Sequence, residues 1–359
     1  FRAFDPTYYY SYRLSQNCQT RATPPPTIIE REIERMCDKK EFRRGSYGKE
    51  TKKINEEIIN VGLVTAINMG DFADVKEIIE TKKVDMNNLG QEYRPALTVA
   101  SIEGQIEIAK YLIEKGADVN VLDEDNLTPL HHAVEVGHAD IIKLLIEYGA
   151  DLNIKGSNDE WTVLHEASQH PRLDILQFLV KSGAKFTREK DGMTCLHIAT
   201  SMGHADNVKF LLESGIDVNA TYGDDGETAL ILAVGLAHFD VVKILVKAGA
   251  NVNGNTLKDK ESPIHIAAGM NHIHMATFLL ENGADVNASM IENLTPLDIA
   301  EQRDFQNMVD LLLQKGASMI RTCTPCPPKQ SSSFSSSTTS NDKFKFQLQS
   351  SSSSSKEKE

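Results

Sequence analysis

Apolar residues between positions 126 and 153 recur at helical spacing in two short blocks. Thr128 is a good helix N-cap, and Pro129 stands at the first helical position, where a missing N–H costs nothing. The apolar residues that follow lie three and four positions apart, as on one face of a helix: Leu130, Ala133 and Val134, then Ile141, Leu144 and Leu145. Glycines at 137 and 149 end the two blocks. The pattern predicts a helix–turn–helix hairpin, which is too short to bury its apolar faces alone.

The same hairpin recurs along most of the chain. Its first apolar residue returns every 32 to 34 positions, at Leu63, Leu97, Leu130, Leu164, Leu196, Leu230, Ile264 and Leu297. The opening reads TPLH at Thr128, TVLH at Thr162, TCLH at Thr194, TALI at Thr228, SPIH at Ser262 and TPLD at Thr295. The closing phrase is GADVN, GADLN, GIDVN or GANVN. Because each unit needs neighbours to cover its apolar faces, the period predicts a stacked array.

The period and the TPLH openings closely resemble the ankyrin repeat family. The resemblance covers roughly residues 60–318 and implies an all-α solenoid of about eight helix–turn–helix units with β-hairpin fingers. We expect four segments: a disordered leader at 1–27, a helical N-terminal extension at 28–59, the array at 60–318, and a Pro/Ser-rich disordered tail at 319–359. The last unit carries polar residues where inner units are apolar, as expected of a terminal cap.

Composition narrows the classes of function. The net charge of −13 argues against general nucleic-acid affinity, since phosphates need neutralising cations. No run of 18 apolar residues would span a bilayer. Cys323 and Cys326 form one CxxC without further zinc ligands, so we expect no metal and no cofactor. We expect a monomeric cytoplasmic protein, with the nucleus as the alternative location.

Repeated histidines do not indicate an enzyme. His131, His165, His197 and His265 all follow the opening Leu or Ile, so we expect each ring to bond the opening Thr or Ser and nearby backbone. The same argument applies to His138, His204, His238 and His272 at the start of the second block. No P-loop, HExxH or GxSxG motif occurs. The closing asparagines resemble substrates of an asparaginyl hydroxylase, but we favour turn residues that bond local backbone.

The resemblance implies that the chain binds proteins as a scaffold or adaptor, through a concave face of fingertips and first helices. Between Pro95 and Thr295, all length variation lies in the connectors between units, as expected of projecting loops on a rigid scaffold. The finger positions are Asp123, Glu124, Asp125, Asp159, Trp161, Met193, Tyr222, Asp224, Asp225 and Glu292. Their acidity favours either a basic partner or plain solubility. Trp161 is either an interface anchor or a buried structural residue.

One more row completes the predicted surface. The position before the end of the first helix runs Met69, Glu103, Val136, His170, Met202, Leu236, Met270 and Arg303. If this row of side chains is exposed, we expect the apolar residues in its middle to form a partner site. The alternative is that these side chains pack against the adjacent finger and are buried. Two other functions stay open: a targeting module of a larger protein with an effector domain upstream of Phe1, or an ankyrin-bearing secreted toxin.

Overall fold

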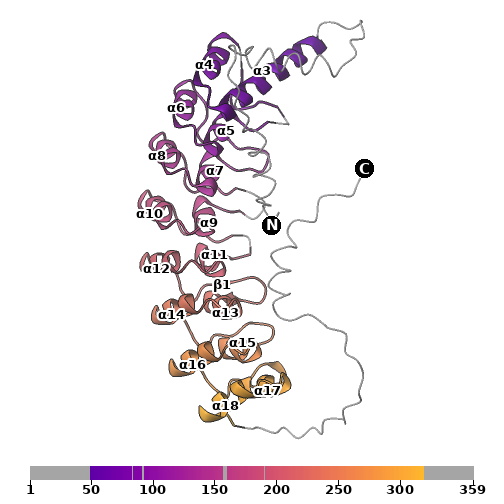
Figure 1. Ribbon diagram of the computed structural model, residues 1–359, viewed down its shortest axis with the longest axis vertical. Helices are drawn as coiled ribbons and strands as arrows, with labels where there is room; N and C mark the ends of the chain where they lie inside the picture. The colour runs from indigo at the N-terminus through magenta and orange to yellow at the C-terminus, as the bar shows by residue number, and fades with distance from the viewer. Residues whose placement is uncertain (1–48, 83, 91–92, 157–159, 190, 319–359) are drawn as a thin grey trace, which may run out of the picture. The chain divides into compact units, whose positions relative to one another are not determined.

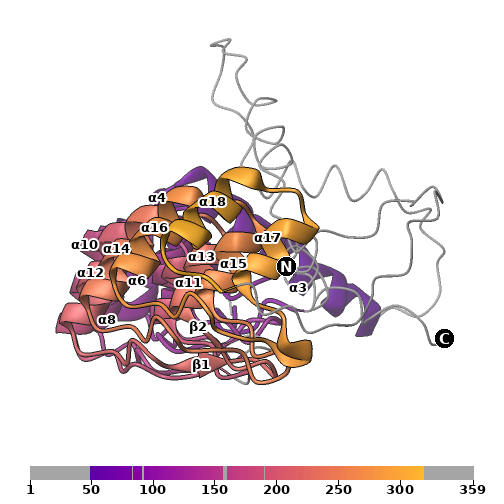
Figure 2. The same ribbon diagram turned by 90° about the horizontal axis from the view of Figure 1, so that it is seen from below.

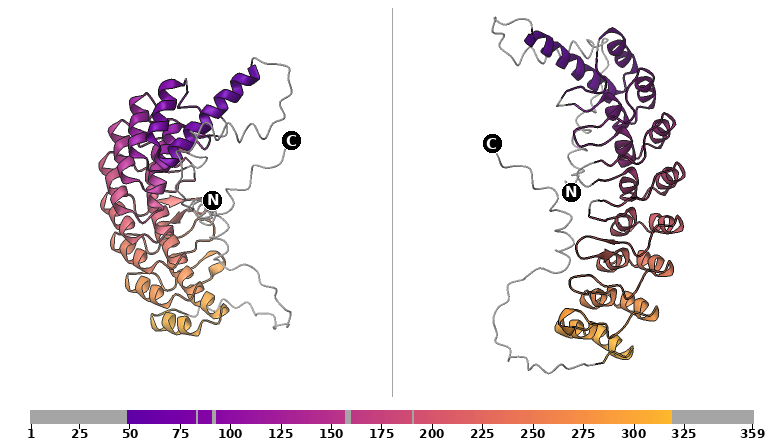
Figure 3. Two further views of the ribbon diagram at one scale, coloured as in Figure 1. Left: turned by 45° about the horizontal axis from the view of Figure 1, so that its top comes forward. Right: turned by 180° about the vertical axis from the view of Figure 1, so that it is seen from behind.

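The computed structural model describes residues 49–82, 84–90, 93–156, 160–189 and 191–318. Within these ranges, helices α3 to α18 follow one another in eight pairs. The pairs stack in chain order, each beside the next, as Figures 1 and 3 show from three directions. The predicted all-α repeat solenoid is therefore confirmed.

Every pair contains a first and a second helix. The first helices are α3 (Lys49–Met69), α5 (Ala96–Ile102), α7 (Pro129–Val136), α9 (Val163–Ser168), α11 (Cys195–Ser201), α13 (Ala229–Gly235), α15 (Pro263–Gly269) and α17 (Pro296–Gln302). The second helices are α4 (Phe72–Thr81), α6 (Ile106–Glu114), α8 (Ala139–Glu147), α10 (Leu173–Lys181), α12 (Ala205–Glu213), α14 (Phe239–Lys247), α16 (Ile273–Glu281) and α18 (Gln306–Gln314). The first helices lie between the second helices and the connections to the next pair (Figure 2).

These connections are the predicted fingers. The finger between the fifth and sixth pairs carries two short antiparallel strands, β1 (Thr221–Tyr222) and β2 (Glu227–Thr228). Single bridges join Gly156 to Trp161 and Arg188 to Thr194 in two other fingers. Another connection contains the 3₁₀ turn η1 (Ile291–Asn293). Backbone bonds join neighbouring fingers, for example from the Leu257 N–H to the Asp225 carbonyl at 2.7 Å.

The core is one continuous apolar layer between the helices. The opening Leu or Ile and the Ala three residues later are buried in every clear unit, as are the apolar residues of the second helices. Leu130, Leu145, Leu164 and Leu176 are among its largest fully buried side chains. Each pair covers its neighbour, so the core is completed only by stacking.

Asparagines link successive pairs. The Oδ1 atoms of Asn120, Asn153, Asn219 and Asn253 accept the backbone N–H groups of Asp151, Lys185, Asn251 and Asp285, at 2.8 to 3.0 Å and 31 or 32 residues further along. We call this row the asparagine ladder. The expectation that the closing asparagines bond local backbone is therefore wrong for these four, because their side chains bond backbone of the next repeat. Thr187 interrupts the ladder, and its Oγ1 is buried without a hydrogen-bond partner.

A second row of bonds runs along the ends of the first helices. The Nε2 atoms of His138, His204 and His238 lie 2.9 to 3.1 Å from the carbonyls of Ile102, Gln169 and Ser201 in the preceding repeat. Because a carbonyl only accepts, each Nε2 carries the proton. Arg172 has the same role in another repeat, since its Nη1 donates to the Glu135 carbonyl at 2.9 Å. These donors satisfy carbonyl groups that a helix C-terminus leaves unpaired.

Some predicted boundaries fall outside the described residues. The leader at 1–27 and the tail at 319–359, with Cys323 and Cys326, lie there, and their assignments stay predictions. The expected division between residues 59 and 60 falls inside α3, which runs from Lys49 to Met69 without a break. Among the described residues, none of the helices combines the length and hydropathy needed to cross a membrane.

Candidate protein-binding surface

The histidines after the opening Leu or Ile have the predicted structural role. The Nδ1 atoms of His131, His165, His197 and His265 lie 2.7 to 3.0 Å from the hydroxyl of the opening Thr or Ser. The backbone N–H of that same Thr or Ser donates to Nδ1 at 3.1 to 3.3 Å, so Nδ1 is an acceptor and the ring is neutral. Burial lowers the pKa of His131, His165 and His197 to about 4. These rings stabilise helix starts and stay uncharged at neutral pH.

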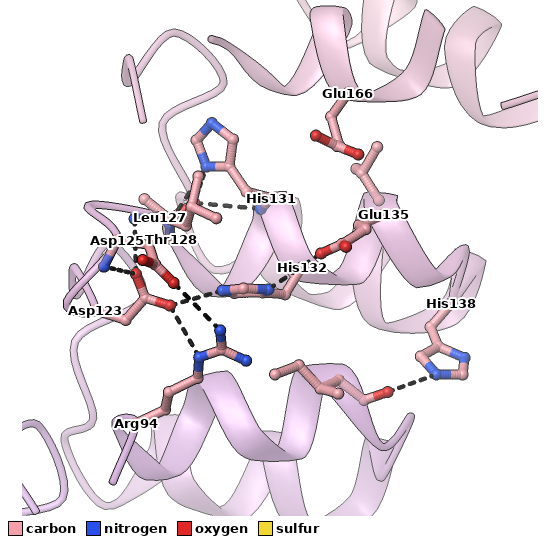
Figure 4. Close-up of polar contacts among 12 residues, drawn as sticks. Arg94, Asp123, Asp125, Leu127, Thr128, His131, His132, Glu135, His138 and Glu166 are labelled. Carbon is pink, nitrogen blue, oxygen red and sulfur yellow. Dashed lines mark hydrogen bonds and ion pairs between the residues drawn. The ribbon is translucent and has the colours of Figure 1, made fainter. Parts of the chain in front are cut away.

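His132, next to the structural His131, has a different environment. Its Nε2 lies 2.7 Å from Asp123 Oδ2, and its Nδ1 lies 3.4 Å from Glu135 Oε2 (Figure 4). Only an imidazolium, with a proton on each nitrogen, satisfies both carboxylates at once. The geometry thus favours a buried cation on the face that α7 turns toward the fingers.

Asp123 joins this histidine to the finger. Its carboxylate is 1% exposed and also meets Arg94 Nε at 3.3 Å. Its Oδ1 accepts the backbone N–H groups of Leu127 and Asp125, at 2.8 and 3.1 Å, which fixes the turn of the finger. Arg94 extends to Asp125 at 3.4 Å. Although the sequence places Asp123 among the finger positions of the binding face, its carboxylate is buried and is not available to a partner.

Charge pairing raises the pKa of the histidine in this network and lowers the pKa values of its two carboxylate partners. Burial opposes the imidazolium, but hydrogen bonds to Asp123 and Glu135 outweigh it and raise the pKa of His132. Burial likewise opposes the Asp123 anion, while the bonds from His132 and the Leu127 N–H lower its pKa. The hydrogen bond from His132 lowers the pKa of Glu135. The network therefore carries charge of both signs near neutral pH.

The predicted apolar row lies at the surface. Met202 and Val136 are 44% and 37% exposed. Leu236 and Met270 are half-buried, and Met270 packs against the core. The alternative that the row is buried therefore does not hold for Val136 and Met202, whereas Leu236 and Met270 are partly covered. His170 is half-buried beside Glu166, at 3.6 Å, and Arg303 bonds the Gly269 carbonyl at 2.7 Å.

The remaining finger residues differ in exposure. Asp224 and Glu124 are exposed, and Asp225 pairs with Lys258 at 2.8 Å. Tyr222 donates its hydroxyl to Glu227 at 2.6 Å, and its ring lies 4.9 Å from that of His197. Trp161 and Met193 are half-buried, which leaves both interpretations of Trp161 open. Asp159 lies outside the described residues, as does the side chain of Glu292.

Three residues of the charge network were not among the predicted site residues: Arg94, His132 and Glu135. The sequence offers one usable signal, the HH doublet at 131–132, because its second histidine is not repeated in the other units. The residue that corresponds to His132 is Glu166 in the next unit, and then Ile198, Leu232 and Ile266. Arg94 gives no such signal, since it stands outside the helical pattern and its link to Asp123 depends on stacking. Among the described residues, no group of three or more His, Cys, Asp or Glu side chains forms a metal site.

Comparison with known proteins identifies the fold family. A family model described as ankyrin repeats in three copies matches residues 63–156, 154–222, 187–256, 221–290 and 254–323. Together these matches cover more than half of the chain, which therefore belongs to the ankyrin repeat family. This fold serves interaction rather than catalysis.

Several curated relatives match short parts of the chain. Ankyrin repeat and SOCS box protein 3 is 37% identical in Bos taurus and 40% identical in Homo sapiens, each over 68 residues, 18% of this chain and 13% of the relative. Human protein phosphatase 1 regulatory subunit 27 is 42% identical over 62 residues, 17% of this chain and 40% of the relative. Each match therefore spans less than half of the relative's length.

Two solved ankyrin domains resemble the array more extensively. The ankyrin repeat domain of Bcl-3, described as a unique member of the IkappaB protein family, has a TM-score of 0.55 at 28% identity and covers 60% of this chain and 97% of that domain. The ankyrin repeat domain of human ASB11 has a TM-score of 0.54 at 25% identity, and the match covers 62% of this chain and 98% of that domain.

Proposed function

We propose that this chain is a protein-interaction scaffold or adaptor, which grips a partner protein with its fingers and the exposed sides of its first helices. The observation that carries the proposal is the apolar row that includes Val136 and Met202. Exposed apolar side chains that recur at one position of stacked repeats form a surface that a partner can cover, and flexible Met side chains adapt to a partner.

The scaffold supports this function because its rigidity does not depend on that row. The asparagine ladder joins the repeats at the turns, and the histidine bonds join them at the ends of the first helices. Neither set of bonds uses Val136 or Met202. A partner can therefore contact these side chains without disturbing the stack.

The test is a double variant, Val136→Glu with Met202→Glu, used in affinity capture with mass spectrometry. Both side chains are exposed, so the charges should leave the thermal unfolding midpoint within a few degrees of wild type. Leu236 and Met270 are unsuitable, because a charge at a half-buried position would also destabilise the fold. Tyr148→Glu is the matched control, since Tyr148 is 41% exposed at the end of the second helix α8.

We expect partners that wild type and the Tyr148→Glu variant retain equally and that the double variant loses. Partners retained equally by all three would refute the proposed surface.

A further inference from the structure

We propose that the partner segment is bipartite, with a Lys or Arg side chain against Glu135 and Glu166 and an adjoining apolar stretch over Met202, Leu236 and Met270. This inference rests on the proposed function and specifies the chemistry of the partner. It follows from a change of chemistry along the first helices that the repeats themselves do not require.

The acidic end lies on α7 and α9. The side chains of Glu135 and Glu166 are 36% and 18% exposed, on neighbouring first helices (Figure 4). Partly buried carboxylates attract a cation more strongly than fully exposed ones, because less water screens the interaction. A basic side chain placed there would be held by two carboxylates.

Nearby cations are already engaged. Arg94 lies against Asp123 and Asp125, and His132 lies between Asp123 and Glu135. Arg172 bonds backbone carbonyls at the end of α7. Glu166 Oε1 lies 3.6 Å from His170 Nε2.

Lys and Arg are also missing from the first helices after α3. Helices α5, α7, α9, α11, α13, α15 and α17 contain no Lys or Arg, whereas they contain four carboxylates, Glu135, Glu166, Asp298 and Glu301. The charge on this face therefore favours a basic partner over an acidic one.

The apolar end begins one repeat later. The residue that corresponds to Glu166 is Ile198 in α11, Leu232 in α13 and Ile266 in α15. Both α13 and α15 end in glycine, so no side chain stands directly before Leu236 or Met270. Ile198, Leu232 and Ile266 are themselves buried, so the apolar side chains that these repeats offer to a partner are Met202 and the half-buried Leu236 and Met270.

The spacing sets the length of the segment. Adjacent packed helices are about 10 Å apart, so the span from α9 to α15 is about 30 Å. An extended chain covers about 3.3 Å per residue, which corresponds to about nine residues. The basic residue should therefore stand at one end of the segment, with the apolar side chains following it.

The test selects phage-displayed random 16-residue peptides on the full chain, so no natural partner is needed. We expect selected peptides to be enriched in Lys or Arg at one end and in apolar residues over the rest. On the Glu135→Gln, Glu166→Gln variant the basic enrichment should fall to the level of the unselected library. A synthetic copy of the most enriched peptide should bind this variant at least tenfold more weakly than wild type.

The matched control is Glu114→Gln with Glu147→Gln, which removes two exposed carboxylates at the ends of second helices α6 and α8. It should bind the synthetic peptide like wild type. Equal basic enrichment on wild type and on the Glu135→Gln, Glu166→Gln variant, or enrichment of acidic residues, would overturn the inference while leaving the proposed function intact. Peptides whose binding is unaffected by Val136→Glu and Met202→Glu would instead contradict the proposed function itself.

Discussion

Acidification from pH 7 to pH 5 is expected to destabilise the array through His131, His165 and His197. Each ring is buried and neutral, and its Nδ1 accepts the backbone N–H of the opening Thr. Burial lowers the pKa from the ordinary 6.5 to about 4 in all three. The unfolded chain binds protons more readily than the folded chain, so stability is fully present above pH 6.5 and is lost as the pH falls toward 4.

The size of the effect follows from the pKa difference. At pH 5 an unfolded histidine is mostly protonated while the folded one is mostly neutral, which costs about 2 kcal/mol for each ring. Three rings together cost roughly 6 kcal/mol, comparable to the whole stability of many domains. His132 acts in the opposite sense, because its raised pKa gives stability that is fully present below pH 6.5 and is lost as the pH rises; this one ring therefore offsets only part of the loss from the three neutral rings.

The assay is urea unfolding followed by circular dichroism at pH 7.5, 6 and 5. The matched variant is His197→Ile, because the sixth repeat already carries Ile231 at the corresponding position. Isoleucine binds no proton, so the variant should lose about one third of the pH-dependent fall in the free energy of unfolding. A wild-type midpoint that is constant from pH 7.5 to 5, or a variant with an unchanged pH dependence, would refute the reasoning.

Two further predictions concern stability. Thr187→Asn should complete the asparagine ladder, because the new side chain can accept the Asp217 N–H, and should raise the free energy of unfolding by about 1 kcal/mol. Urea unfolding midpoints measure this gain. The control, Thr187→Val, removes the unpaired hydroxyl without adding a bond and should gain less. His132→Ala should lower the free energy of unfolding by about 2–3 kcal/mol, because buried Asp123 loses its partner at 2.7 Å but keeps Arg94 and two N–H donors. The Glu135→Gln variant should lose much less stability in the same urea assay. Equal losses in the two variants would contradict the assigned role of His132.

Local sequence patterns were sufficient for the helices and their register. Thr128 caps α7, Pro129 is its first residue, and Gly137 ends it at a φ of 95°, as the pattern predicts. The repeated histidine of the opening motif also has the expected bond, because both partners lie three residues apart on one turn. Interactions of this kind are visible in the sequence because they are short in chain distance.

Bonds between repeats were not visible in the same way. The bond from His138 to the Ile102 carbonyl joins residues 36 positions apart, and Asn120 meets Asp151 across 31. The sequence shows that such residues recur, but only the stacking geometry shows which group of the neighbouring repeat they reach. Asp123 was misjudged for the same reason, since its burial depends on Arg94 in the preceding repeat and on His132 in the following helix.

The division between stacking residues and variable residues explains how one scaffold can change its specificity. Bonds between repeats come from the closing asparagines and from the histidines at the starts of the second helices, whereas the opening motif caps its own helix. The residue after that motif's histidine makes none of these bonds between repeats, and it changes from His132 to Glu166 to Ile198 along the array. Because the Glu166 side chain is partly exposed, substitutions at that residue should alter the choice of partner with little effect on folding, whereas His132 and Ile198 are buried and their replacement should also destabilise the repeat.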